Sequence, residues 1–246
     1  MRLISLLKAA GAAAALACAG ASMAGVTVDA IKKRGELVCG VSQGSAGLSI
    51  ADKQGRWTGL DADLCRALAA AVLGDPEKTR FVPLSSQQRF PALQGGEIDV
   101  LNRNTTITSS RDARAANPDD FVILPERINK SPLGPFVRQD DPNWTAIVRW
   151  TVNALVAAEE LGITSRNVDS QAQSSDAQVR RLLGLDPGIG KGFGLDEGWA
   201  RNVIRAVGNY GEVWDRNLGA ATPLKLDRGL NRQWNQGGLL YSPPFQ

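Results

Sequence analysis

The residues with the clearest chemical potential lie between Glu97 and Asp112, in the stretch EIDVLNRNTTITSSRD. It begins as a short apolar strand, and Thr108-Ser109-Ser110-Arg111 is typical of a helix start with a hydroxyl N-cap. Free backbone N–H groups at a helix start favour an anion, and a planar guanidinium can hold a carboxylate through two hydrogen bonds. The stretch is therefore a candidate carboxylate site with Arg111 as its cation. The alternative is a surface arginine beside an ordinary turn, since motifs this loose often arise by chance.

The composition argues against several other chemistries. The chain of 246 residues contains no histidine, which removes Ser-His-Asp and Cys-His catalysis and the commonest metal ligand. No Cys/His spacing typical of a metal site occurs, so we expect neither a metal nor a cofactor. The net charge of +3 is weak and dispersed along the chain, which argues against nucleic acid as a partner.

Residues 1–24 are typical of a signal peptide. Arg2 and Lys8 give a positive start, an alanine-rich apolar core follows, and small residues near Ala24 suit a signal peptidase. The apolar run is too short to cross a bilayer, although an uncleaved anchor is the alternative. We therefore expect an exported protein of a bacterial periplasm.

Two cysteines, Cys39 and Cys65, follow the expected signal peptide. In an oxidising compartment an even pair is typical of a disulfide, and the alternative is two buried free thiols. Cys39 falls on an expected strand and Cys65 on the helix after it, so the two face each other if that helix packs back on the sheet. A disulfide there would close a loop of about 26 residues and contribute about 3 kcal/mol in the chain-entropy model.

Strand and helix patterns alternate through the first half of the chain. This alternation predicts an α/β fold with a mostly parallel sheet and flanking helices. In such sheets ligands bind beyond the carboxyl ends of the strands, where the loop 42–49 and the turn 102–111 both lie. The expected strands are 36–41, 81–84 and 98–101, and the expected helices are 26–34, one capped by Asp61 and ended by Gly74, and a short one capped by Ser85-Ser86.

The second half is expected to be mainly helical. The clearest helix begins at Asp141-Pro142, a cap followed by a proline at the first helical position, and ends at Gly162. Residues 187–194 contain several glycines but lack the spacing of a phosphate loop, so we expect a flexible loop there. The other expected elements are strands at 121–124 and 135–138, a weak helix at 171–183, helix from 196 to 218 interrupted near 208–211, and a short helix at 228–236.

Several phrases of the sequence resemble periplasmic amino-acid-binding proteins of polar amino-acid ABC transporters, in particular the general L-amino-acid-binding subtype. The resemblance covers nearly the whole chain after the signal peptide. It is carried by RGELVCGVSQG (34–44), WTGLDADLCRALAAAVLGDPEK (57–78), RFPALQGGEIDVLNRNTT (89–106), SRD (110–112), ILPERINKSPLGPFVRQDDPNW (123–144), AEELGITSRNVD (158–169), VGNYGEVWDRNLG (207–219) and RGLNRQWNQGGLLYSPP (228–244).

In that family two α/β lobes close on the ligand like a clamp. The resemblance implies that Arg111 binds the α-carboxylate of an L-amino acid and that Thr106 and Asn104 line the same pocket. It also implies that Ser42 and Ser45 lie where relatives place ligand contacts of the first loop. The implied partner is an inner-membrane ABC permease, and the implied activity is binding rather than catalysis.

The chain departs from the family directly after Asp112. Where the family inserts on the order of a hundred residues, about the size of a small domain, only residues 113–116 separate Asp112 from Asn117. The missing part would be most of the second lobe, so we expect amino-acid binding to be weakened or lost. The alternatives are a remnant that binds nothing and a periplasmic dehydratase-like enzyme on the same fold.

The resemblance and the departure together predict five segments. They are a signal peptide (1–24), a first α/β lobe (25–112), a junction in place of the second lobe (113–122), returning strands and a helix on the first lobe (123–162) and a helical C-terminal extension (163–246).

Overall fold

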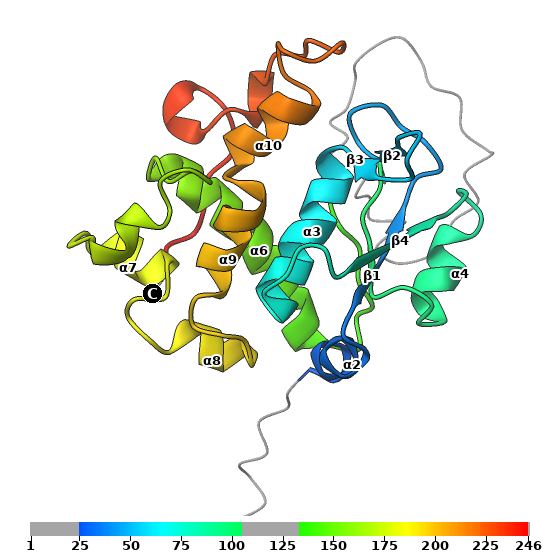
Figure 1. Ribbon diagram of the computed structural model, residues 1–246, viewed down its shortest axis with the longest axis horizontal. Helices are drawn as coiled ribbons and strands as arrows, with labels where there is room; N and C mark the ends of the chain where they lie inside the picture. The colour runs from blue at the N-terminus through cyan, green and yellow to red at the C-terminus, as the bar shows by residue number, and fades with distance from the viewer. Residues whose placement is uncertain (1–24, 105–132, 246) are drawn as a thin grey trace, which may run out of the picture.

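The computed structural model of the protein describes residues 25–104 and 133–245 (Figure 1). The expected signal peptide, the expected strand at 121–124, and the candidate site residues Thr106 and Arg111 lie outside the described residues.

A three-stranded parallel sheet forms the centre of the first half (Figure 1). Strand β1 (Leu37–Val41) lies between β4 (Thr79–Pro83) and β5 (Val100–Leu101), and all five of its residues are buried. A strand covered on both faces reads as a continuous apolar run, which is how 37–41 appears in the sequence. The expected α/β class with a parallel sheet is therefore confirmed.

Helices cover both faces of the sheet, as Figure 1 shows with α3 and α4 on opposite sides of β1. Leu37, Cys39 and Val41 face the larger core, which includes residues of α2 (Val26–Arg34), α3 (Leu60–Leu73) and α6 (Pro142–Glu160). Val38 faces a smaller core under α4 (Arg89–Gln94). The alternation of β1 side chains thus divides the interior into two layers.

Several expected boundaries hold, and two caps are corrected. Helix α2 ends at Gly35 and α3 ends at Gly74, each glycine having the left-handed backbone that suits this position. Asp61 is not the N-cap of α3, because Gly59 holds that position and Asp61 lies inside the first turn. The N-cap of α4 is Gln88 rather than a serine. A short antiparallel hairpin of β2 (Ile50–Ala51) and β3 (Trp57–Thr58) confirms the expected turn at 51–56.

Asp141 fastens the start of α6 to the start of α2. Its carboxylate accepts hydrogen bonds from the backbone N–H of Trp144, at 2.9 Å, and of Thr27, at 2.8 Å. Burial alone would raise the pKa of Asp141, but these N–H donors outweigh it and hold the pKa below its usual value. The predicted cap is confirmed, and it also joins two helices more than a hundred residues apart in the chain.

The C-terminal part is helical, as expected, with three corrections. The expected helix at 171–183 is divided into a 3₁₀ turn and a separate short α-helix. The interruption near Gly208 is confirmed, and Asn209 and Glu212 form a capping box where the second helix begins. Residues 189–193 form a short helix rather than a loop, because Glu197 accepts hydrogen bonds from three N–H groups around it. Residues 228–236 form two 3₁₀ turns rather than one α-helix. The elements are η2 (Ser170–Gln173), α7 (Ala177–Leu182), α8 (Ile189–Phe193), α9 (Trp199–Val207), α10 (Tyr210–Asn217), η3 (Gly229–Asn231) and η4 (Trp234–Gln236).

The expected strand at 135–138 is reduced to a single bridge. Phe136 exchanges two backbone hydrogen bonds of 2.8 Å with Leu101, and the neighbouring residues do not continue the ladder. Phe136 nevertheless packs edge-to-face on Phe90, which brings the returning chain onto the smaller core.

Cys39 of β1 and Cys65 of α3 form a disulfide, as expected. The bond ties the central strand to the helix that covers it. Both residues are fully buried, so it lies inside the larger core.

Reduction of this disulfide should lower the free energy of unfolding by about 3 kcal/mol, because the loop it closes regains its freedom in the unfolded chain. Urea denaturation with and without dithiothreitol measures the effect. A variant with Cys39→Ala and Cys65→Ala is the control and should not respond to the reductant. Equal stability of the wild-type protein in both conditions would contradict the prediction.

Candidate functional site

The carboxyl-terminal edge of the parallel sheet gathers polar residues from three strands. Ser42 directly follows β1, Ser85 comes shortly after β4, and Asn102 directly follows β5. Ligands of open parallel sheets bind at this edge, so it is the candidate functional site.

Ser42 is turned into the loop that follows it. Its hydroxyl lies 2.7 Å from the hydroxyl of Ser49 and donates to the Ser49 carbonyl at 3.1 Å, and Ser42 is only 4% exposed. Ser45 closes the same loop through its backbone, donating to the Ser49 carbonyl at 2.7 Å. The Ser42 hydroxyl therefore shapes the loop rather than facing solvent.

Asp61 lies beneath this loop and is 5% exposed. Burial raises the pKa of Asp61 to about 7, and a hydrogen bond from the Ser49 hydroxyl and the positive charge of Arg103 only partly oppose that shift. The Ser49 hydroxyl lies 3.4 Å from the Asp61 carboxylate. Asp61 therefore takes up a proton near neutral pH.

Three consecutive residues after β5 occupy different environments. Asn102 is buried, and its amide donates to the Asp61 carbonyl at 2.7 Å, which joins β5 to the first turn of α3. Arg103 donates to the Leu84 carbonyl at 3.0 Å, and burial lowers the pKa of its guanidinium. Asn104 is exposed, and its side-chain oxygen accepts from Arg103 at 3.4 Å.

The structure places only some of the candidate site residues. Ser42, Ser45 and Asn104 lie at or beside the same sheet edge, whereas Thr106 and Arg111 lie outside the described residues. Asp61, Asn102 and Arg103 were not expected as site residues. Asn102 and Arg103 fall in the expected turn 102–111 directly after a strand, and Asp61 was expected only as a helix cap.

Comparison with known proteins identifies the family. Residues 37–166 match the bacterial extracellular solute-binding proteins, family 3. This chain belongs to that family. The match spans the parallel sheet, the candidate edge and helix α6.

Relatives extend the similarity over the rest of this solute-binding protein. It is 36% identical over 337 residues to the general L-amino acid-binding periplasmic protein AapJ of Rhizobium johnstonii. The alignment covers 98% of this chain and 99% of AapJ. It is 38% identical over 323 residues to the glutamate/glutamine/aspartate/asparagine-binding protein BztA of Rhodobacter capsulatus, covering 93% of this chain and 95% of BztA. Both alignments are longer than this chain of 246 residues, consistent with an internal deletion.

A solved structure agrees with the fold. The periplasmic binding protein of an ABC transporter from Brucella ovis, determined with glutathione bound, is 36% identical and has a TM-score of 0.84. The similarity covers 89% of this chain and 99% of that one.

The C-terminal helices of this solute-binding protein support the candidate edge. Arg216 and Asn217, at the end of α10, both donate to the same carboxylate oxygen of Asp63, at 2.8 and 2.6 Å. A Cβ on Gly47 would lie only 2.5 Å from side-chain atoms of both Leu218 and Leu224, and Gly47 has a positive φ of 74°. The loop 42–49 therefore packs directly against residues that follow α10. This close approach requires a glycine at position 47.

The described residues contain no group of His, Cys, Asp or Glu side chains suited to a metal ion. In the same part of the chain, no helix combines the length and apolar character that a membrane crossing requires.

Asp61→Asn should stabilise the protein at high pH but not at low pH. The folded-state pKa of about 7 lies above the 3.8 that is usual for an aspartate in water. The wild-type protein therefore loses stability as pH rises from about 4 to 7, by at most about 4 kcal/mol. An asparagine cannot ionise, so the free energy of unfolding of Asp61→Asn should not show this fall with pH. Urea denaturation across this range measures the difference.

Asp215→Asn is the control for that comparison, because Asp215 is exposed. It should follow the wild-type pH dependence. If Asp61→Asn also follows the wild-type curve, Asp61 is ionised in the folded protein and the prediction is wrong.

Asn217→Ala should loosen the loop 42–49. Hydrogen bonds to charged groups contribute about 1.5 to 3 kcal/mol to stability. Because Asp63 keeps its arginine partners in this variant, we expect the free energy of local opening to fall by about 1 to 2 kcal/mol. Amide hydrogen exchange at Leu48 and Ser49 should become faster. Asn231→Ala, at an exposed position in the same extension, should leave those amides unchanged. Unchanged exchange in Asn217→Ala would show that α10 does not hold the loop.

Proposed function

We propose that this chain is an extracytoplasmic solute-binding component of an ABC transporter and captures L-amino acids without covalent chemistry. The observation that carries the proposal is the near full-length similarity to AapJ and BztA, whose names give amino acids as ligands. The sheet edge with Ser42, Ser45 and Asn104 is the place for the ligand. Export to the periplasm through the signal peptide at 1–24 and delivery to an inner-membrane permease are parts of the same proposal.

The ligand carboxylate is proposed to bind Arg111 and the N–H groups near Thr106. A guanidinium holds a carboxylate through two charge-assisted hydrogen bonds, and a helix start adds N–H donors of the right sign. Asn104 leads directly into this segment and is exposed, which leaves its amide available to a ligand. No acid–base pair is needed for this role, so we propose that the chain is not an enzyme.

Capture is proposed to be weak, because the junction at 113–122 replaces most of the second lobe. A ligand held by one lobe keeps its carboxylate contacts, but its ammonium group lacks an opposite charge. Removing one side of a buried charge pair costs about 2 to 5 kcal/mol. Water also reaches the open site and screens the remaining arginine–carboxylate pair. The segments 25–112, 123–162 and 163–246 then make up one lobe with its extension.

The protein should bind amino acids at least about a thousandfold more weakly than AapJ, because it lacks the contacts of the second lobe. Isothermal titration of both proteins with glutamate, glutamine and arginine measures the difference. Insertion of the AapJ segment that the junction replaces should restore much of the affinity. The same insertion with Arg111→Met should not.

Sub-micromolar binding of an amino acid by the 246-residue chain without the inserted segment would contradict the proposed weak binding. Failure of the insertion to restore any binding, in a protein that keeps its thermal transition, would contradict amino-acid capture and favour a remnant without ligand.

A further inference from the structure

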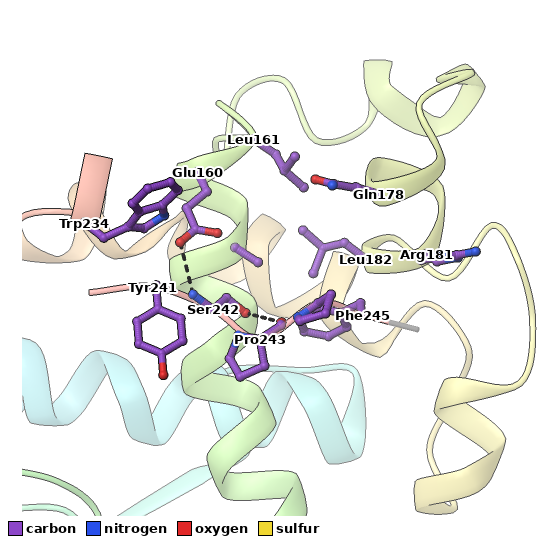
Figure 2. A pocket seen from close by; sticks show the side chains of 12 residues that line it. Glu160, Leu161, Gln178, Arg181, Leu182, Trp234, Tyr241, Ser242, Pro243 and Phe245 are labelled. Carbon is purple, nitrogen blue, oxygen red and sulfur yellow. Dashed lines mark hydrogen bonds between the residues drawn. The ribbon is translucent and has the colours of Figure 1, made fainter. Parts of the chain in front are cut away.

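A pocket of about 600 Å³ lies between the end of α6, helix α7 and the last residues of the chain (Figure 2). Its apolar wall includes Leu161 of the α6 end, Leu182 of α7 and Phe245. We call it the α6–α7 pocket. It involves none of the residues of the sheet edge, so an inference about it does not depend on amino-acid capture.

The apolar wall of this pocket is firmly held. The Phe245 ring packs edge-to-face on Trp150, with ring centroids 4.9 Å apart, and lies 6.3 Å from Trp199. Phe245 is almost fully buried, as is Leu182. The pocket is thus built on the main core and does not need a ligand to form it.

Two aromatic rings of the pocket are left open to solvent. Trp234 is 63% exposed and Tyr241 is 65% exposed, whereas every other tryptophan of the described chain is buried or half-buried. Large aromatic side chains usually bury most of their area, and an exposed group of them marks a binding site more often than scattered apolar residues do.

The carboxylate of Glu160 lies between these two rings in the view of Figure 2 and lines the same pocket. One of its oxygens accepts a hydrogen bond of 3.0 Å from the Ser242 backbone. The other oxygen has no hydrogen-bond or ion-pair partner among the described residues. The Glu160 carboxylate therefore holds the final segment of the chain in place through one oxygen. Its other oxygen remains able to accept a hydrogen bond.

The opposite wall of the pocket comes from α7 and carries Gln178 and Arg181. Arg181 is exposed, and Figure 2 shows its guanidinium directed away from the pocket. The charge that faces the pocket at its aromatic end is therefore negative.

We propose that the α6–α7 pocket binds an organic cation, in which an ammonium group lies between Trp234, Tyr241 and Glu160 and an apolar body covers Leu161 and Leu182. Aromatic faces attract a desolvated ammonium through their quadrupoles, and a carboxylate supplies the matching charge. The apolar wall favours a ligand with a hydrocarbon or aromatic portion over a bare inorganic cation. Tetraalkylammonium groups suit this arrangement because they are weakly hydrated and need no hydrogen-bond acceptor of their own.

Titration with benzyltrimethylammonium, followed by calorimetry and ligand-observed NMR, tests the proposal. We expect saturable binding with a dissociation constant of about 1 mM or lower. Benzyl alcohol has a similar apolar body without the charge and should bind at least about tenfold more weakly.

Three variants locate the site. Trp234→Leu and Tyr241→Leu keep an apolar side chain but remove a ring, and each should weaken binding about threefold to fivefold. Glu160→Gln keeps an acceptor for the Ser242 N–H and removes the charge, and it should weaken binding about tenfold. Glu77→Gln, at an exposed position that does not line the pocket, is the control and should bind as the wild type does.

Absence of saturable binding in the millimolar range would overturn the proposal. Equal affinity for the cation and the alcohol would also overturn it, as would wild-type affinity in all three pocket variants. Circular dichroism and the thermal transition of each variant show whether weaker binding reflects the pocket or a loss of folded protein.

Discussion

The burial of helix α3 is the constraint on which the rest of the structure depends. Eleven of its 14 residues are buried, so apolar and small side chains face outward in nearly every direction. A helix of this kind must be covered all round. The sheet covers one side and is tied to it by the Cys39–Cys65 disulfide, while α9 and α10 pack against α3 from the C-terminal half. The C-terminal helices are therefore part of the same core as the parallel sheet and α3.

Two carboxyl groups in the first turn of α3 show how burial and charge are reconciled. Asp63 is buried but accepts hydrogen bonds from Arg216 and Asn217, so its charge is compensated inside the protein. Asp61, two residues earlier, has no ion-pair partner in the described chain and instead has its pKa raised by burial. The two neighbours thus follow the two routes available to a buried acid, pairing and neutralisation. Both routes also serve the candidate edge, because Asp63 holds α10 against the loop and Asp61 contacts Ser49 within it.

Two further contacts join the parallel sheet and α2 to the part of the chain that follows residue 132. The returning chain pairs with β5 through Phe136, and Asp141 then fastens α6 to α2 by a hydrogen bond to Thr27. These contacts join residues 25–104 directly to residues 133–245.

Local chemistry made much of the fold predictable. Gly35 and Gly74 end their helices, and Asp141-Pro142 begins one, because caps and left-handed turns depend on a few consecutive residues. Period and composition indicated the parallel sheet, and the even cysteine count indicated the disulfide. The expected parallel sheet indicated its carboxyl-terminal edge as the place for a ligand.

Tertiary structure decided what depends on residues distant in the chain. Helix α8 forms in a glycine-rich stretch because Glu197 binds its N–H groups, and the Ser42 hydroxyl turns inward because Ser49 meets it. The raised pKa of Asp61 depends on how fully its neighbours exclude water. The pocket beside Trp234 exists because the last residues of the chain return to α6. Sequence determines local backbone preference, whereas burial and partner geometry arise only when separate segments pack together.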